Sequence, residues 1–292
     1  MSLLVPMLSW LTKSRVPGAM RLAAAVFPPF PYATRHAELE LRRTDGLRMW
    51  LDTRHHIEWE VAFAGAFEPR IGELLRGRAA AGSTAIDVGA NIGVHTLTLP
   101  EIVGPGGQVI ALPPNPVARE RLVRNLRING FQDRVTVVGS AAGDAPGRAL
   151  LHVPSASRVT GGNVGIASLA GLETPHDEVD VEIVTLDELL SGRSIPRVSL
   201  VKIDTQGFAV KVLRGMARIL RSDRPLVVLE YERWAWNRAG ERLQPLLEWL
   251  AGFGYGATTL QDSGLRRPLT AELDAGLPDH SDLVAAPEAL PL

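Results

Sequence analysis

The chain has 292 residues, of which 46% are apolar and only 5% aromatic, so aliphatic side chains must fill a core large enough for one α/β domain with an extension or for two small domains. Its formal net charge of −1 comes from 31 basic and 32 acidic residues and gives no electrostatic reason to expect nucleic acid as a partner. Because the chain has no cysteine, disulfides, thiolate catalysis and cysteine-ligated zinc are excluded, and we expect a reducing, cytoplasmic setting.

An N-terminal arm is the first predicted feature. Its apolar stretch Leu3–Leu11 precedes the first positive charge, Lys13, which is the reverse of the order in a signal peptide. The stretch is shorter than the ~18 apolar residues that a membrane-spanning helix needs, and prolines divide the arm into short pieces. We expect the arm to pack on the domain. The alternative is a peripheral membrane anchor, because Arg15 and Arg21 accompany Lys13 among the apolar residues.

Residues 36–53 predict a β-hairpin, since two strand-type runs flank the turn Thr44-Asp45-Gly46. The arm and this hairpin make up a predicted N-terminal unit of residues 1–60. Residues 57–79 then predict helix, broken near Pro69. We assign residues 61–292 to the main domain.

Strands and helices alternate through the main domain. Apolar runs predict strands at 84–89, 108–112, 134–143, 198–204 and 225–232, and the clearest helices cover 117–130 and 208–220. Repeated strand–helix units with almost continuously apolar strands indicate an α/β fold with a doubly wound, mostly parallel sheet that is covered on both faces. Residues 148–185 interrupt this rhythm, are rich in Gly, Ser, Thr and Asn, and are expected to form an insertion over the ligand crevice.

The loop after the first of these strands is a candidate binding loop. It reads Asp87-Val88-Gly89-Ala90-Asn91-Ile92-Gly93, and its glycines allow a tight turn and a close approach of backbone to a ligand. The G-x-x-x-G spacing is neither the G-x-G-x-x-G of dinucleotide-binding proteins nor a P-loop. Taken alone, the loop is equally compatible with a tight strand–helix turn that binds nothing.

Several motifs in a fixed order accompany this loop. They are IDVGANIGVHTL, VIALPPNPVARERLVRNLRING, a strand ending in SAAGD, TLDELL, VSLVKIDTQGFAVKVLRGM and PLVVLEYE, which together span about residues 66–232. This set closely resembles the FkbM family of S-adenosylmethionine-dependent methyltransferases. The resemblance implies a Rossmann-like class I methyltransferase domain, S-adenosylmethionine as the cofactor, and O-methylation in natural-product or surface-glycan pathways.

The resemblance also implies roles for individual residues. The loop that holds the methionyl part of the cofactor matches Asp87, Gly89, Asn91 and Gly93. The turn that meets the ribose contains Asn115, and the segment that lines the adenine contains Ala141 and Asp144. At the end of the fourth strand, Asp204 is expected to face the transferred methyl group.

Methyl transfer to a hydroxyl also needs a proton acceptor. The candidates are Asp204, Glu230 and His95, and for His95 we prefer a structural role at the start of the helix behind the loop. Lys202 and Gln206 are candidates for orienting the acceptor. We predict no metal site, because no close cluster of ligands is evident in the sequence.

Two positions depart from the family pattern. Pro113 stands where relatives carry a glutamate that binds both ribose hydroxyls, and Ala209 stands where they carry another glutamate. Losing a charged hydrogen bond to ribose costs about 1.5–3 kcal/mol. These departures keep open the alternative that the chain is a catalytically degenerate, methyltransferase-fold binding protein.

Other activities fit the sequence poorly. The turn Asp204-Thr205-Gln206-Gly207 is unlike that of amino-group methyltransferases of nucleic acids, and a nicotinamide-dependent oxidoreductase would need a different glycine pattern. We therefore predict an S-adenosylmethionine-dependent methyltransferase that acts on a hydroxyl of a small molecule, natural product or sugar.

Overall fold

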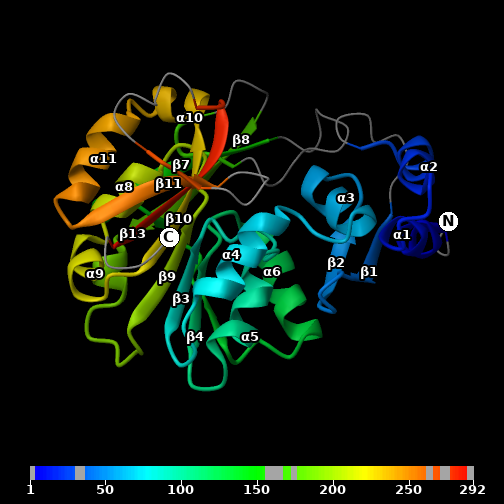
Figure 1. Ribbon diagram of the computed structural model, residues 1–292, viewed down its shortest axis with the longest axis horizontal. Helices are drawn as coiled ribbons and strands as arrows, with labels where there is room; N and C mark the ends of the chain where they lie inside the picture. Colours follow the sequence, from blue (N-terminus) through cyan, green and yellow to red (C-terminus); the bar gives the residue numbers. More distant parts are fainter. Residues whose placement is uncertain are drawn as a thin grey trace.

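The computed structural model describes residues 4–29, 37–154, 167–171, 176–260, 266–269 and 277–287. Among these residues, eight strands form the main sheet in the order β12-β11-β13-β10-β9-β3-β4-β5 (Figure 1). Their bounds are β3 Thr84–Val88, β4 Gln108–Leu112, β5 Val135–Val137, β9 Val198–Ile203, β10 Leu226–Glu232, β11 Tyr255–Leu260, β12 Arg266–Pro268 and β13 His280–Pro287. The strands from β5 to β10 pair in parallel, whereas β13 runs antiparallel to both β10 and β11.

Helices cover both faces of this sheet. Successive side chains of a strand point to opposite faces, and those of the central strands are apolar on both, so each face needs helices packed against it. Ala85 and Leu200 pack in the core beneath α4 (Pro69–Arg78), α5 (Leu99–Val103) and α6 (Pro116–Ile128). Ile86 and Val201 pack in the opposite core, beneath α7 (Leu186–Leu189), α8 (Ala209–Arg214), α9 (Ala217–Ser222), α10 (Arg233–Arg238) and α11 (Leu243–Ala251). The predicted Rossmann-like, doubly wound and mostly parallel fold is confirmed.

Two of the predicted elements are divided. The single helix expected over 208–220 is interrupted between α8 and α9 at Gly215, where a Cβ would lie 1.9 Å from the carbonyl oxygen of Gly143. This close approach of two backbones needs a bend that a continuous helix would not provide. The strand expected over 134–143 becomes β5 in the main sheet and β6 (Ala141–Ala142) in a second sheet.

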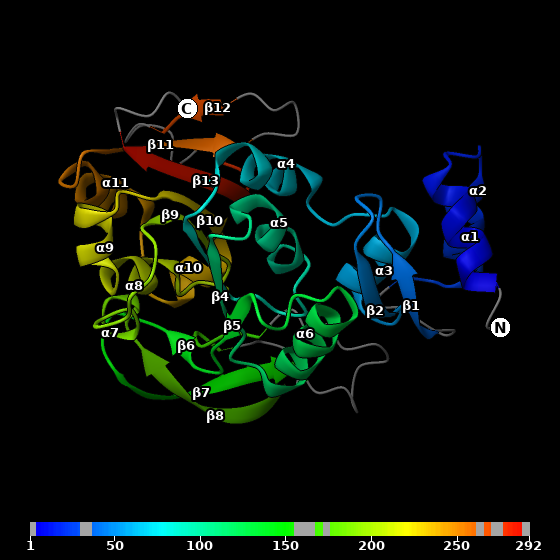
Figure 2. The ribbon, with the colours of Figure 1, turned by 90° about the horizontal axis from the view of Figure 1, so that it is seen from below.

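This second sheet belongs to the insertion. It has the order β6-β8-β7, with β7 (Gly147–Pro154) antiparallel to β8 (His176–Val184), and Figure 2 shows it apart from the main sheet. One side packs Leu151 against Ala141 and Val181. Part of the Gly- and Asn-rich stretch noted in the sequence, residues 161–166, lies outside the described residues.

The N-terminal unit lies at one end of the molecule (Figures 1 and 2). It consists of α1 (Leu4–Lys13), α2 (Ala19–Val26), the hairpin β1 (Glu38–Arg42) and β2 (Arg48–Asp52), and α3 (His56–Phe63). The predicted hairpin is confirmed, and the expected boundary at residue 60 falls inside α3. In the described part of the chain, no helix is long and apolar enough to cross a membrane.

A buried asparagine of α6 joins this unit to the candidate binding loop. The side-chain oxygen of Asn125 accepts the backbone N–H of Trp50 in β2 at 2.8 Å, and its amide nitrogen donates to the carbonyl of Ile92 at 3.0 Å. Arg121, one turn earlier on α6, pairs with the carboxylate of Glu58 in α3. The N-terminal unit is therefore attached to the helix that packs behind the loop.

Candidate cofactor and catalytic site

A cavity of about 440 Å³ lies at the carboxyl ends of β3, β4, β9 and β10. Its wall also includes residues of α3, the start of α6 and the insertion. The volume falls within the range typical of small-molecule sites, ~300–1,000 Å³. The position is the one at which open parallel α/β sheets bind ligands.

The turn after β3 forms one wall of this cavity. Gly89 has φ +77°, and a Cβ at this position would lie 1.6 Å from the carbonyl oxygen of Asp204. Asn91 also adopts a positive φ of +47°. Its buried side-chain oxygen has no hydrogen-bond partner within the described residues. This wall is therefore closely packed against the turn after β9, and it contains one buried oxygen whose hydrogen-bonding capacity is unsatisfied.

The other two predicted loop residues lie behind the wall. Asp87 is 1% exposed, and its carboxylate accepts a hydrogen bond from the Thr96 hydroxyl at 2.6 Å. Gly93 has φ +94°, and a Cβ there would come within 2.4 Å of the Leu122 side chain. Both residues shape the loop from behind.

The predicted ribose and adenine residues are divided in the same way. Pro113, Asn115 and Ala141 line the cavity, and the Asn115 side chain accepts the N–H of Val117 at 3.0 Å to begin α6. Asp144 is exposed and does not line the cavity. Sequence similarity alone placed it at the adenine.

Asp204 is held by a buried lysine. The ammonium of Lys202, which is 4% exposed, lies 3.2 Å from the carboxylate of Asp204 and 3.8 Å from that of Asp87. Burial acts to lower the pKa of Lys202, but the two carboxylates outweigh it and raise this pKa. Burial likewise acts to raise the pKa of Asp204, and Lys202 outweighs it and holds this pKa below its usual value. Lys202 thus fixes Asp204 as an anion and is not in the cavity wall.

Glu230, at the end of the neighbouring strand, has the opposite behaviour. Burial, followed by the charge of Asp204, raises the pKa of Glu230 well above its usual value. The amide of Gln206 donates to its carboxyl group at 2.8 Å. The pKa values of two adjacent carboxyl groups are therefore shifted in opposite directions, an arrangement suited to pairing a proton acceptor with a proton donor.

His95 lies outside the cavity wall. It is 6% exposed, precedes the short helix η1 (Thr96–Thr98), and its Nε2 lies 2.9 Å from the Glu68 carboxylate. Glu68 itself lines the cavity. His95 therefore contacts a residue of the cavity wall, Glu68, without lining the cavity itself.

Several lining residues were not anticipated from the sequence. His56 and Glu60 come from α3 of the N-terminal unit, and Glu232 and His280 come from the adjoining ends of β10 and β13. The i,i+4 pair of His56 and Glu60, with 3.2 Å between Nε2 and Oε1, was the only local signal. The others are brought together by strand pairing.

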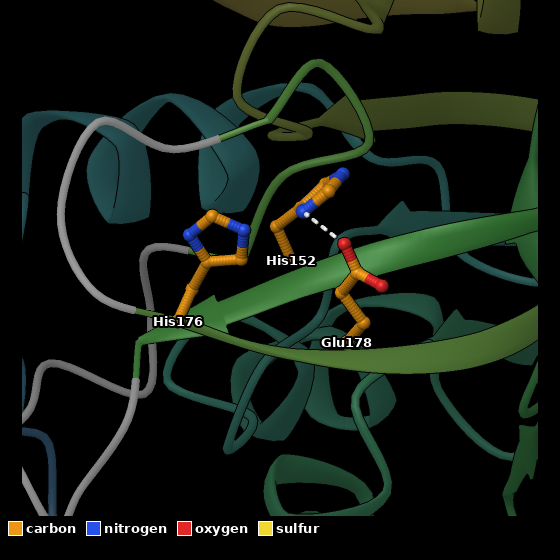
Figure 3. A group of neighbouring side chains, drawn as sticks. All are labelled: His152, His176 and Glu178. Carbon is orange, nitrogen blue, oxygen red and sulfur yellow. Dashed lines mark ion pairs between the residues drawn. The ribbon is translucent and has the colours of Figure 1, made fainter.

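Two groups of side chains have donor atoms within 4.8 Å of one another and could hold a metal ion. One is Glu230, Glu232 and His280 in the cavity wall. The other is His152, His176 and Glu178, on the opposite face of the β7–β8 hairpin from Leu151 (Figure 3). There, Nδ1 of His152 lies 3.8 Å from Oε1 of Glu178. The expectation of no metal stays a prediction.

Known proteins are similar to the central part of the chain. Residues 87–256, more than half of the chain, match the family described as the methyltransferase FkbM domain. Hexuronic acid methyltransferase AglP of Haloferax volcanii is 30% identical over 144 residues, which are 47% of this chain and 51% of AglP. Methyltransferase sdnD of Sordaria araneosa is 27% identical over 154 residues, 45% of this chain and 59% of sdnD. The matches span only about half of these relatives' lengths.

Solved structures are similar at low identity. The crystal structure of methyltransferase FkbM from Methylobacillus flagellatus KT aligns with a TM-score of 0.40 and 16% identity, covering 73% of this chain and 50% of that chain. The putative transferase PH0793 from Pyrococcus horikoshii aligns with a TM-score of 0.43 and 13% identity, covering 97% of this chain and 86% of that chain. Because these TM-scores and identities are low, the description of the fold depends on the strand order given above and not on these structures. On the match of residues 87–256, the chain belongs to the methyltransferase FkbM domain family.

Proposed function

We propose that the protein is an S-adenosylmethionine-dependent methyltransferase that methylates a hydroxyl group of a small molecule or sugar. The observation that carries this proposal is the meeting of Gly89 and Asp204 at one cavity, where a carboxylate with a lowered pKa lies beside the glycine turn. Such a site can align a donor with an acceptor and remove the acceptor's proton.

The residues fit this cofactor at two points. The position of Gly89 leaves room only for backbone, and the unsatisfied Asn91 oxygen is suited to accept a hydrogen bond from the methionyl ammonium. When bound, S-adenosylmethionine would supply an electrophilic methyl group: its carbon–sulfur bond would break as the acceptor oxygen bonds to the methyl carbon, and the sulfur would leave as a neutral thioether. Asp204 takes the hydroxyl proton as the new carbon–oxygen bond forms. Glu230, whose pKa is raised, is suited to donate a hydrogen bond to the neighbouring Asp204 carboxylate.

The charge of the cavity favours an uncharged acceptor. Carboxyl groups of Glu60, Glu68, Asp204, Glu230 and Glu232 line it, and the described lining residues include no lysine or arginine. A carboxylate on the acceptor would be repelled by the ionised members of this set. AglP is named for hexuronic acid, an anionic sugar, and we infer that this chain prefers a neutral hydroxyl compound instead.

Calorimetric titration with S-adenosylmethionine tests cofactor binding first. Purified protein is then incubated with methyl-labelled S-adenosylmethionine and matched neutral sugars and uronic acids, with and without EDTA. Binding and labelling of the neutral sugars support the proposal, and the EDTA arm tests the expectation of metal independence. Absence of any cofactor binding at millimolar concentration overturns it.

A catalytically degenerate binding protein is the second candidate. Pro113 lines the cavity where relatives carry the ribose-binding carboxylate, and the buried Ala209 begins α8 where they carry another. Cofactor binding without label transfer to any acceptor in the panel, or to water-soluble cell extract, would favour this candidate.

A further inference from the structure

Exposed large apolar side chains are concentrated on the first two helices. Of the eight that the described residues expose, five lie between positions 7 and 22: Met7, Trp10, Val16, Met20 and Leu22. Trp10 is 66% exposed, more than any other. The remaining three, at positions 117, 150 and 234, belong to separate elements. Exposed apolar residues scattered over a protein are ordinary, whereas several within one short stretch of the chain point to an interaction surface.

This exposure does not come from helices that are detached from the protein. The inner sides of α1 and α2 are packed, with Val5, Leu8 and Ala23 fully buried. The Ser9 hydroxyl donates to the Ala62 carbonyl of α3 at 2.6 Å. The two helices are therefore fixed to the N-terminal unit, and their outer side faces away from the main sheet (Figures 1 and 2). The arm packs on the protein as expected, but only through its inner side; its outer side is exposed.

The charge around this surface has one sign. Residues 1–37 contain no aspartate or glutamate, and the first acidic residue of the chain is Glu38. Arg15 lies in the turn between the helices and Arg21 lies on α2, and both are exposed. The rest of the chain holds all 32 acidic residues. Exposed arginines beside exposed apolar side chains complement an anionic partner.

We propose that the outer side of α1 and α2 docks reversibly on an anionic phospholipid bilayer. Tryptophan prefers the boundary between lipid and water, and arginines beside it are attracted to anionic head groups. Short helices with one apolar side bind in the plane of the interface without crossing it. A symmetric contact between two copies would instead bring the same arginines together with no acid in residues 1–37 to pair with them. This inference does not depend on the proposed methyl transfer.

Co-sedimentation of the full chain with vesicles tests it. One set contains phosphatidylcholine alone, and the other contains equal parts of phosphatidylcholine and phosphatidylglycerol. We expect binding to the anionic set, weakening as salt is raised, and little binding to the neutral set. Trp10→Ser and Arg21→Glu should each weaken binding by roughly ten-fold. The matched controls are Trp234→Ser, which removes a tryptophan that is 42% exposed on α10, and Arg127→Glu on α6.

Absence of binding by the unmodified chain, or equal losses in the control variants, overturns the proposal. Dimers that form with rising protein concentration and are abolished by Trp10→Ser would make the surface a contact between copies, and would also overturn it. Thermal unfolding of each variant checks folding. If Trp10→Ser fails to fold, Leu22→Ser carries the same test, since Leu22 is 49% exposed.

Discussion

Residue 89 can carry no side chain because of Asp204. A Cβ at position 89 would lie 1.6 Å from the Asp204 carbonyl oxygen, and the Asp204 N–H donates to the carbonyl of Val88 at 3.0 Å. The binding loop after β3 and the proposed base after β9 are thus joined through their backbones. Placing one of them also places the other.

Gly89→Ala is therefore expected to abolish cofactor binding and to destabilise the protein. The contact with the Asp204 carbonyl adds about 1–3 kcal/mol of overpacking to the ~1–2 kcal/mol cost of a left-handed alanine. Gly130→Ala is the matched control, because Gly130 has a similar φ of +71° with no atom within 4 Å of its Cβ position. It should lower the free energy of unfolding slightly and leave calorimetric binding unchanged. Normal binding by Gly89→Ala would refute the assigned loop.

Pro113→Glu is expected to tighten cofactor binding about ten-fold, since it restores a charged hydrogen-bond acceptor for ribose. Pro114→Glu removes the adjacent proline and adds the same charge, and it should not tighten binding. Calorimetry on both variants separates the two effects. Unchanged or weaker binding by Pro113→Glu would mean that ribose is held elsewhere in the cavity.

Asp204→Asn is expected to lower the single-turnover rate about 10²–10⁴-fold with little change in cofactor affinity, because only the proton acceptor is removed. Glu230→Gln should retain more activity, since a neutral amide resembles a protonated carboxyl. If affinity collapses in Asp204→Asn while the rate at saturating cofactor survives, Asp204 is a cofactor ligand and not the base.

The rate should also depend on pH in a defined direction. Asp204 has a lowered pKa, so it stays ionised until the pH falls below the usual range of aspartate, and the rate should decline only there. Glu230 has a raised pKa and becomes charged as the pH rises through that value, which should produce a decline on the alkaline side. Single-turnover rates against pH should show this alkaline decline in the unmodified chain and lose it in Glu230→Gln.

Lys202→Met is expected to leave the buried carboxylate of Asp87 and the partly buried carboxylate of Asp204 without their cation. Breaking a buried ion pair in this way costs about 3–5 kcal/mol of the free energy of unfolding. The pKa of Asp204 should rise, so the acidic decline in rate should move to higher pH. Lys211→Met is the control, because it makes the same substitution at a lysine whose ammonium lies over the Phe208 ring, 4.3 Å from its centre, instead of between two carboxylates. An acidic decline at the same pH in both variants would exclude Lys202 as the group that keeps Asp204 ionised.

The sequence by itself determined the positions of the five parallel strands, β3, β4, β5, β9 and β10, and of the candidate binding loop after β3. Apolar runs such as 84–89 and 198–204 are local signals, and β3 and β9 occupy those positions within one residue. Gly89 was predicted from its place after a strand and Asn91 from the family resemblance, and both line the cavity. Backbone conformation and strand burial depend mainly on neighbouring residues, which is why the sequence carries them.

Only the tertiary structure decided the electrostatics of the site and the outer surface of the arm. Lys202 was expected to orient the acceptor. It lies outside the cavity wall, and its ammonium is near the carboxylates of Asp87 and Asp204. His280 reaches the cavity because β13 pairs with β10, nearly fifty residues away along the chain. Protonation states depend on burial and on charges from distant strands, and exposure depends on which side of a helix finds a partner. Neither property is encoded by any short segment.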